Sequence, residues 1–450
     1  MNTPPDSKKT VQSFFRDRAA NAQRGKRLPA PLGHADNTIE AAGFPGVRLS
    51  IDEADEALRS VADRLAPLRP LLGRDDFNIL ALSGGAAGGA FGAGALVGLT
   101  KAGTRPRFAI VTGVSTGALI APFAFLGPTW DDRLAEAYVG GHAADLLSLK
   151  SLGPTLGPSL FRGDSLDGLV APFVDLEMIE AIAGEHARGR RLLIATTNLD
   201  SQKATIWDMG EIATRGGEAA VRLFRDVLVA SATLPGLFPP KLIDVEAPDG
   251  EGGVTHYQEM HADGGIAAPL FLMPDALLRW RELGQRLRRG RVYVIFNTVL
   301  DPSPLTTQPG VASIMGRSFE TMLRFSYRQA LSVAAGFCAR HNLPLWSASI
   351  PASFSHFNMM KFETAVMRRT FDDAEALAIS GRLWSSAIPA PEPLWRGLFK
   401  RQSGTRRQTV KDPILTPALA APDEPPIDLA ADPAANPAVG PGVEREEPIS

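Results

Sequence analysis

Short apolar runs alternate with longer stretches of helical periodicity over most of the chain. Continuous apolar runs bounded by turn residues predict strands at 77–82, 108–112, 191–197 and 292–297, with a partner strand at 204–209. Apolar positions at helical spacing predict helices over 50–69, 90–102, 218–232, 311–340 and 360–386, and an Ala-rich helix that breaks near Pro122. Strands that alternate with helices indicate an α/β fold of three layers, with a mainly parallel central sheet flanked by helices.

Composition divides the chain into three parts. Residues 1–72 join a basic arm to the amphipathic helix, and residues 73–400 carry the α/β pattern. Within the second part, 128–190 have weak periodicity and several Gly-Pro pairs, which suits a cap region over a site. Residues 401–450 form a Pro/Ala-rich tail, of which the last 40 hold nine prolines and no aromatic residue, a composition typical of disorder.

Charge and composition exclude several classes of protein. The chain has 47 Lys and Arg against 49 Asp and Glu, whereas nucleic-acid binders are normally strongly basic. The single cysteine, Cys338, excludes an intrachain disulfide and a Cys-rich metal site. The 7 histidines are scattered and no H-E-x-x-H occurs, so we expect no metal site. The first residues contain no apolar leader, which favours a cytoplasmic protein, with peripheral attachment to a membrane as the alternative.

Two uncharged runs, 79–100 and 108–130, raise the alternative of two membrane spans. Seven glycines fall within the first run, and each costs about 1 kcal/mol inside a helix. A strand, a Gly-rich loop and a helix use these glycines better than a membrane span does, so we expect no transmembrane helix.

A serine between two glycines follows the strand at 108–112. Gly113-Val114-Ser115-Thr116-Gly117 is a G-x-S-x-G pattern in the strand–turn–helix context of a nucleophile elbow. The turn would project Ser115 Oγ from the sheet, with the free N–H groups of the helix N-terminus behind it. The structural alternative is a chance pair of glycines around a serine in a Gly/Ala-rich chain.

A Gly-rich loop, Ser83–Gly89, follows the strand at 77–82. Backbone N–H groups in such a loop suit either a nucleotide phosphate or the oxyanion of an ester carbonyl. Neither a Walker A lysine nor a G-x-G-x-x-G pattern accompanies the loop, so the oxyanion interpretation is favoured. Tight packing of a helix on a strand is the structural alternative.

The segment His261-Ala262-Asp263-Gly264-Gly265 places an acidic residue before two glycines. Asp263 would accept the Ser115 proton and later return it to the leaving group, which requires a confined and partly dry site because an ordinary Asp is a weak base. An Asx-type turn is the structural alternative. His261 would share one face of a strand with Asp263, where we expect it to contact the substrate or to have a structural role.

These segments together resemble the patatin-like phospholipase family. The resemblance rests on LALSGGAAGGAFGAGAL, GVSTG, SATLPGLFPP at 231–240 and ADGG in this order, with TTNLDSQKATIWDMG at 196–210 similar to a strand pair of the family. It covers roughly residues 77–300.

The resemblance implies a lipid acyl hydrolase of the phospholipase A, lysophospholipase or esterase type. Such an enzyme works through a Ser–Asp dyad and an acyl-enzyme, without a cofactor, on substrates at a lipid or membrane interface. Ser115 would be the nucleophile and Asp263 the general base and acid. The oxyanion hole would comprise the N–H groups of Gly84, Gly85, Ala86, Gly89 and Thr116, and the motif glycines are Gly113, Gly117, Gly264 and Gly265.

Two positions depart from the family pattern. Ala86 stands where a third glycine is usual, and Gly88 where Arg or Lys is common. An alanine still offers its N–H if its φ remains negative. The missing basic residue bears on the catalytic rate and weakens any preference for phosphate-bearing lipids.

Two other functions remain open from the sequence. The first is a Ser-His-Asp esterase, for which His341 and His356 lie downstream of Asp263, and the second is a catalytically degenerate protein that binds lipid. Candidate contacts with a lipid surface are the aromatic and basic residues at 395–401, which suit a packed final helix equally well.

Overall fold

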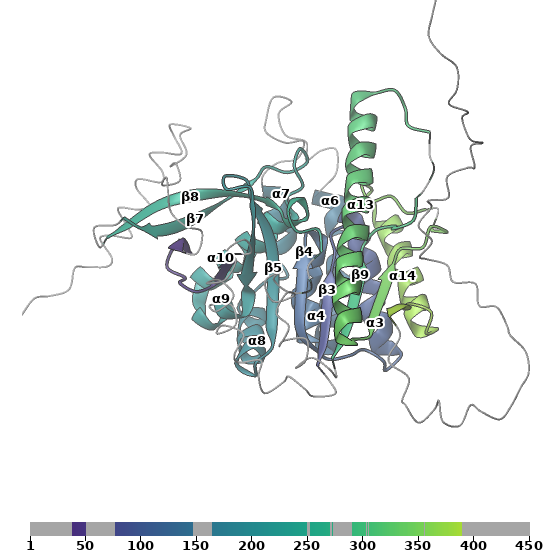
Figure 1. Cartoon of the computed structure of the whole chain (residues 1–450), viewed down its shortest axis with the longest axis horizontal. Helices are drawn as coiled ribbons and strands as arrows, with labels where there is room; N and C mark the ends of the chain where they lie inside the picture. The colour runs from purple at the N-terminus through teal and green to yellow at the C-terminus, as the bar shows by residue number, and fades with distance from the viewer. Residues whose placement is uncertain are drawn as a thin grey trace, which may run out of the picture. The chain divides into compact units, whose positions relative to one another are not determined.

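Buried apolar runs form the central strands of a mixed sheet (Figure 1). The structure, a computed structural model, describes residues 38–50, 77–146, 164–249, 253–270, 272, 290–302, 304, 306–354 and 356–388. All of these belong to one of two units of the chain, Met1–Glu392. The predicted basic arm before residue 38, the predicted helix after Ser50, the candidate lipid contacts at 395–401 and the tail 401–450 lie outside the described residues.

The sheet has 11 strands within the described part of the chain. They are β1 Glu40–Ala41, β2 Arg48–Ser50, β3 Asn78–Leu82, β4 Phe108–Val114, β5 Arg191–Asn198, β6 Lys203–Asp208, β7 Lys241–Pro248, β8 Val254–Asp263, β9 Arg291–Phe296, β10 Leu345–Ser349 and β11 Ser385–Ile388. Their order is β1-β7-β8-β5-β4-β3-β9-β10-β11, with β6 on the other edge of β5 and β2 beside β6.

The centre of the sheet is parallel, as the sequence predicts. β5, β4, β3, β9 and β10 run in one direction, and their ladders are in continuous register apart from a shift near Asn78. Antiparallel strands extend the sheet at both edges. β3, β4 and β5 are buried on both faces, which explains their continuous apolar sequences.

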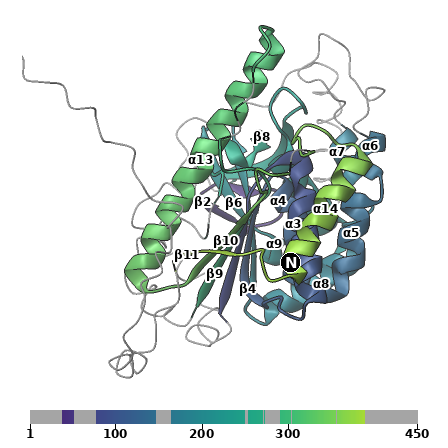
Figure 2. The same cartoon turned by 90° about the vertical axis from the view of Figure 1, so that its right-hand side faces the viewer.

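Helices cover both faces of this sheet. They are α3 Gly89–Lys101, α4 Thr116–Leu126, α5 Asp131–Val139, α6 His142–Leu146, α7 Asp164–Val170, α8 Leu176–Ala187, α9 Met209–Arg215, α10 Gly217–Ala232, α13 Val311–His341 and α14 Thr364–Ile379. One core lies between the sheet and the layer that contains α3, α4, α8, α10 and α14, and a second lies between the sheet and α13. Figure 2 shows α13 on one side of the sheet and α3, α5 and α14 on the other, which is the three-layer α/β arrangement predicted.

The glycines of α3 allow a second helix to approach closely. A Cβ on Gly94 would lie 2.2 Å from the Phe371 carbonyl oxygen of α14, and one on Gly98 would lie 2.6 Å from that of Glu375. Glycines four residues apart thus form the contact face between α3 and α14. Among the described residues, no helix has both the length and the apolar character needed to cross a bilayer.

Two predicted helix boundaries are wrong. The helix after Ser115 does not break near Pro122, because α4 continues through that proline to Leu126. The predicted helix over 360–386 ends at Ile379, where Gly381 takes a φ of +69° and residues 385–388 enter the sheet as β11. A glycine just after the last helical turn is a common helix terminator.

Candidate active site

Strand β5 brings two distant segments together as their common partner. β4 pairs with β5 up to Val114, which lies opposite Ala195, and β8 pairs with the next residues, Asp263 lying opposite Thr196. β6 occupies the other edge of β5 along both stretches, so β4 and β8 follow one another on the same edge. Ser115, the residue after β4, therefore comes beside Asp263 at the end of β8.

Ser115 occupies a sharp turn between β4 and α4. Its φ of 55° and ψ of −127° form a backbone conformation that residues with a Cβ rarely adopt. Its N–H donates to Ser231 Oγ at 3.0 Å, and Ser231 Oγ donates to the Ala195 carbonyl oxygen at 2.7 Å. This strained strand-to-helix turn has the geometry of a nucleophile elbow.

The glycines on either side of Ser115 leave room for neighbouring backbone. A Cβ on Gly113 would lie 2.6 Å from the Gly117 carbonyl oxygen, and one on Gly117 would lie 2.4 Å from that of Leu82. Both distances are shorter than any ordinary contact, and the atoms that would be met belong to the backbone. The elbow therefore requires glycine at both positions.

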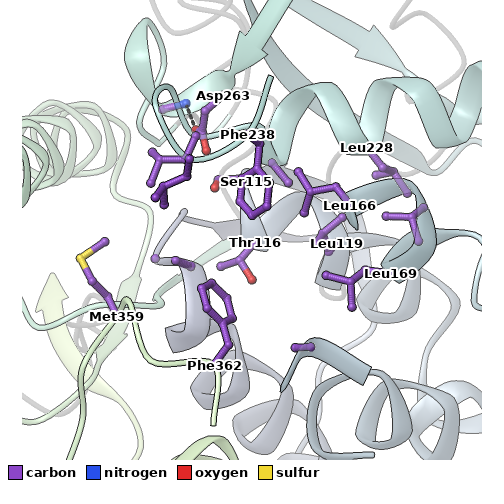
Figure 3. A pocket seen from close by; sticks show the side chains of 18 of the residues that line it. Ser115, Thr116, Leu119, Leu166, Leu169, Leu228, Phe238, Asp263, Met359 and Phe362 are labelled. Carbon is purple, nitrogen blue, oxygen red and sulfur yellow. Dashed lines mark hydrogen bonds between the residues drawn. The ribbon is translucent and has the colours of Figure 1, made fainter. Parts of the chain in front are cut away.

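Asp263 is held by its backbone and by one of its two carboxylate oxygens. Its N–H donates to the Thr233 carbonyl at 2.9 Å, and Oδ1 accepts from the Gly265 N–H at 2.7 Å. The Asx-type turn weighed as the structural alternative is thus present. It leaves Oδ2 buried and without a hydrogen bond of normal geometry from the described residues. Figure 3 shows the carboxylate and the Ser115 hydroxyl turned toward one another.

Burial changes the proton affinity of this carboxylate. It raises the pKa of Asp263 to about 6, and the nearby Ser115 hydroxyl and the Gly265 N–H limit the rise. A carboxylate with this pKa is mostly ionised at pH 7, yet it is a stronger base than an ordinary aspartate. Asp263 therefore has the confined and partly dry surroundings that a general base requires.

The Gly-rich loop passes close to the Ser115 side chain. A Cβ on Gly84 would lie 2.9 Å from Ser115 Cβ and 3.4 Å from Ser115 Oγ. The N–H groups of Gly84, Gly85 and Ala86, and that of Thr116 at the first position of α4, make no hydrogen bond with the described residues. These amides can therefore donate to a ligand beside Ser115.

Asn297 fixes this loop from the neighbouring strand end. Its Nδ2 donates to the Ser83 carbonyl at 2.7 Å, and its Oδ1 accepts from the Gly92 N–H at 3.1 Å. The Asn297 carbonyl oxygen would lie 1.9 Å from a Cβ on Gly85 and 2.0 Å from one on Gly88. Gly88, where Arg or Lys is common in the family, is thus a position without room for a side chain.

Two expectations for this loop are corrected. The N–H of Gly89 caps the short 3-10 helix Ala86–Gly88 by donating to the Ala86 and Ala87 carbonyls, so it is not free to bind an oxyanion. Ala86 does not keep a negative φ, because its φ is +50° and it thus takes a conformation that favours glycine. We therefore leave Gly89 out of the oxyanion hole.

Ser115 lines an apolar cavity of about 210 Å³. Its walls include Leu119 of α4, Leu228 of α10 and Phe238, together with Leu166 and Leu169 of α7 (Figure 3). Val170 of α7 also lines it. The α7 residues belong to the region predicted as a cap. Such a cavity suits the hydrocarbon chain of a ligand whose polar end reaches Ser115.

His261 does not contact this cavity. It is wholly buried, with Nδ1 2.9 Å from Thr196 Oγ1 and Nε2 3.1 Å from Glu259 Oε2. Arg48 Nη2 lies 2.9 Å from the same Glu259 oxygen. The prediction that His261 contacts the substrate is wrong, because these buried partners occupy both ring nitrogens, and its role is structural.

The triad alternative finds no histidine at Ser115. None of the described residues that line the cavity is a histidine. His341 lies at the end of α13 against the Phe337 ring, and His356 stacks on Phe354. Within the described ranges, no cluster of His, Cys, Asp or Glu side chains is arranged to hold a metal ion.

Sequence reasoning missed three residues around Ser115. Asn297 directly follows β9 beside the Gly-rich loop, and a polar residue at the carboxyl end of a buried parallel strand is a signal that could have found it. Ser231 lies in the segment SATLPGLFPP. Tyr327 comes from the middle of α13, where its spacing matches ordinary core positions, so no local signal distinguishes it.

Comparison with known proteins supports the predicted resemblance. The family model for patatin-like phospholipases matches residues 80–275. No curated protein sequence is significantly similar to the chain. Among solved structures, the chain is similar to the crystal structure of VipD from Legionella pneumophila, with 12% identity over 70% of this chain and 68% of that chain. The TM-score of this match is 0.29.

The matched residues include most of the machinery described above. They contain the Gly-rich loop, the elbow at Ser115, the α7 wall of the cavity and the turn at Asp263. Residues 80–275 of the chain are thus a patatin-like phospholipase domain.

Proposed function

We propose that the chain is a serine lipid acyl hydrolase that cleaves carboxylic esters through Ser115 and Asp263. The observation that carries this proposal is the buried carboxylate of Asp263 facing the Ser115 hydroxyl in the wall of an apolar cavity. The family of the domain, which supports lipid acyl hydrolysis in general, agrees with it.

The reaction proceeds in two acyl-transfer steps. Ser115 Oγ attacks the ester carbonyl carbon while Asp263 takes the hydroxyl proton, and the N–H groups of Gly84, Gly85, Ala86 and Thr116 stabilise the oxyanion. Collapse of the tetrahedral intermediate breaks the ester bond, and Asp263 returns the proton to the departing alcohol. Water, deprotonated by Asp263, then attacks the acyl-enzyme; the bond from the acyl carbon to Ser115 Oγ breaks, Asp263 returns the proton to Oγ, and the carboxylic acid leaves.

The cavity supports an acyl chain as the part of the substrate that is bound. Its described walls are mainly aliphatic and aromatic, and Ile266 and Met322 both line it and are about half exposed or more. The cavity therefore continues into an apolar rim, which suits a lipid that enters from an aggregate. The first test measures kcat/KM on p-nitrophenyl esters of increasing acyl-chain length. We expect kcat/KM to rise from the acetyl ester toward medium and long chains.

Narrowing the cavity is expected to shift this preference. Leu169→Trp fills the α7 wall, so long-chain esters should lose about tenfold in kcat/KM while acetyl ester hydrolysis stays unchanged. Leu176→Trp, at an exposed position of α8, is the matched control and should keep the wild-type profile. An unchanged profile in a folded Leu169→Trp protein would place the acyl chain elsewhere.

Restoring the basic residue common in the family is expected to harm this protein. In Gly88→Arg the new Cβ meets the Asn297 carbonyl oxygen, so the Gly-rich loop must shift away from Ser115. We expect a loss of at least tenfold in kcat and about 2 kcal/mol or more in the free energy of unfolding. Gly316→Arg, where a Cβ meets nothing, is the control. Higher activity in Gly88→Arg would show that the loop has room for a cation.

A lipid-binding protein without catalysis is the second candidate. The positive φ of Ala86 and the glycine at position 88 favour it, since both depart from the family pattern. Three features argue against a protein that only binds lipid: the strained backbone of Ser115, the raised pKa of Asp263 and the free amides of the Gly-rich loop. A binding site needs none of them.

A further inference from the structure

Tyr327 brings a phenol hydroxyl to the Ser115 site from the opposite layer of the fold. It belongs to α13, is only 2% exposed and lines the cavity. Its ring packs edge-on against Phe296 at a centroid distance of 6.0 Å. Phe296 precedes Asn297, so the same strand end positions the tyrosine ring and the Gly-rich loop.

The Tyr327 hydroxyl and the Ser115 side chain flank one backbone position. A Cβ on Gly84 would lie 2.9 Å from Tyr327 Oη and 2.9 Å from Ser115 Cβ. The absence of a side chain on Gly84 thus keeps a small space open between the two hydroxyl-bearing residues. That space adjoins the amides of the Gly-rich loop, where the oxyanion of the proposed reaction would form.

The surroundings keep the phenol protonated. Burial raises the pKa of Tyr327, the Asp263 carboxylate raises it further, and the Ser83 hydroxyl opposes this rise only in part. A phenol that stays neutral is a hydrogen-bond donor over the whole range in which an esterase works.

We propose that the Tyr327 hydroxyl donates a hydrogen bond to the oxyanion of the tetrahedral intermediate, alongside the amides of the Gly-rich loop. This role rests on the proposed ester hydrolysis. The hydroxyl would add a side-chain donor to the oxyanion hole. At position 88 of the Gly-rich loop the Asn297 backbone leaves no room for the basic residue common in the family. The donor comes from outside residues 80–275, the part that the family model matches.

Two other roles for the same hydroxyl make different predictions. A donor to Asp263 would stabilise its carboxylate, so removing it would raise the pH at which activity appears. A donor to the leaving group would matter most for esters of poor leaving groups. If the hydroxyl instead donates to the oxyanion, its removal lowers kcat equally for all leaving groups and leaves the pH dependence unchanged.

The test compares Tyr327→Phe with Tyr293→Phe, which removes a phenol hydroxyl from a residue packed between Phe108 and Trp384 away from the cavity. For Tyr327→Phe we expect kcat to fall about 100-fold on both p-nitrophenyl and alkyl esters, with KM and the pH midpoint unchanged. Tyr293→Phe should match the wild type, and thermal unfolding should show both variants folded.

Four results would overturn the proposal. Wild-type kcat in a folded Tyr327→Phe protein would remove the hydroxyl from the reaction. A raised pH midpoint, or a loss confined to poor leaving groups, would assign it to Asp263 or to the leaving group instead. The Ser115→Ala protein is measured alongside. If it hydrolyses esters as fast as the wild type, the proposed function itself is overturned; if it is inactive while Tyr327→Phe keeps wild-type kcat, only the role of Tyr327 is overturned.

Discussion

Ser115→Ala is expected to lower kcat for ester hydrolysis by about 10⁶-fold, the loss that removal of the nucleophile causes in serine hydrolases. Without Oγ no acyl-enzyme forms, and only the contribution of the loop amides and of substrate binding remains. The variant should fold, because Ser115 N–H, not its side chain, makes the hydrogen bond that holds the turn. Initial rates on a medium-chain p-nitrophenyl ester measure the effect.

A second serine in the same cavity provides the control for this variant. Ser326 lines the cavity from α13 and takes no part in the proposed reaction. Ser326→Ala should therefore keep most of the wild-type activity. Activity above a few per cent in folded Ser115→Ala, or an equal loss in both variants, would contradict the assignment of the nucleophile.

Asp263→Asn is expected to lose about 10³- to 10⁴-fold in kcat and yet to unfold at a higher temperature than the wild type. The activity falls because an amide cannot accept the Ser115 proton. The stability rises because folding moves the Asp263 pKa from its usual 3.8 to about 6, so burying the ionised group costs about 3 kcal/mol at neutral pH.

The sign of this pH dependence follows from the direction of the pKa change. The folded protein binds the Asp263 proton more tightly than the unfolded chain, so the contribution of this group to stability is largest below pH 3.8 and is lost as the pH rises through about 6. Thermal unfolding at pH 5 and pH 8 should therefore show a larger gap between the two proteins at pH 8. Equal melting temperatures at pH 8 would contradict the buried, ionised state.

The same group sets the pH dependence of the reaction. A general base must be ionised, so wild-type kcat/KM should fall about tenfold per pH unit below pH 6 and level off above it. The residual activity of Asp263→Asn should lack this step.

The strands that build the site could be predicted from the sequence because they are buried on both faces. Continuous apolar runs placed β3, β4, β5 and β9 within one or two residues of their observed bounds. β7 and β8 were missed, since their residues alternate between buried and half-exposed positions and contain several charged side chains. Without β8, the sequence could not show that β5 aligns Asp263 with the end of β4.

The chemistry at Ser115 could be predicted only where it depends on local sequence. The elbow and the Asp263 turn are short motifs, whereas the availability of an N–H group depends on the hydrogen bonds around it. Gly89 was therefore assigned to the oxyanion hole although its amide caps a 3-10 turn. Strand alternation predicts His261 at the site, but its two buried partners decide its position. Thr196 lies 65 residues away in the sequence, and Glu259 belongs to no motif that would mark it as a partner.

Gly88, which stands where the family commonly has Arg or Lys, shows what a comparison of sequence motifs misses. In sequence it reads as the loss of a basic residue, while the structure shows the Asn297 backbone in the space that a side chain would need. Tyr327 could not be predicted at all, because α13 joins the site from the other face of the sheet. Both features arise from packing between segments far apart in the chain.

The most direct test of the Ser115–Asp263 account is active-site labelling with a fluorophosphonate, followed by mass measurement of the labelled peptide. The account predicts one adduct in the wild type, on Ser115. It predicts no adduct in Ser115→Ala and a slow, incomplete one in Asp263→Asn. A label on another residue, or a folded wild-type protein that hydrolyses esters and takes no label at Ser115, would contradict it.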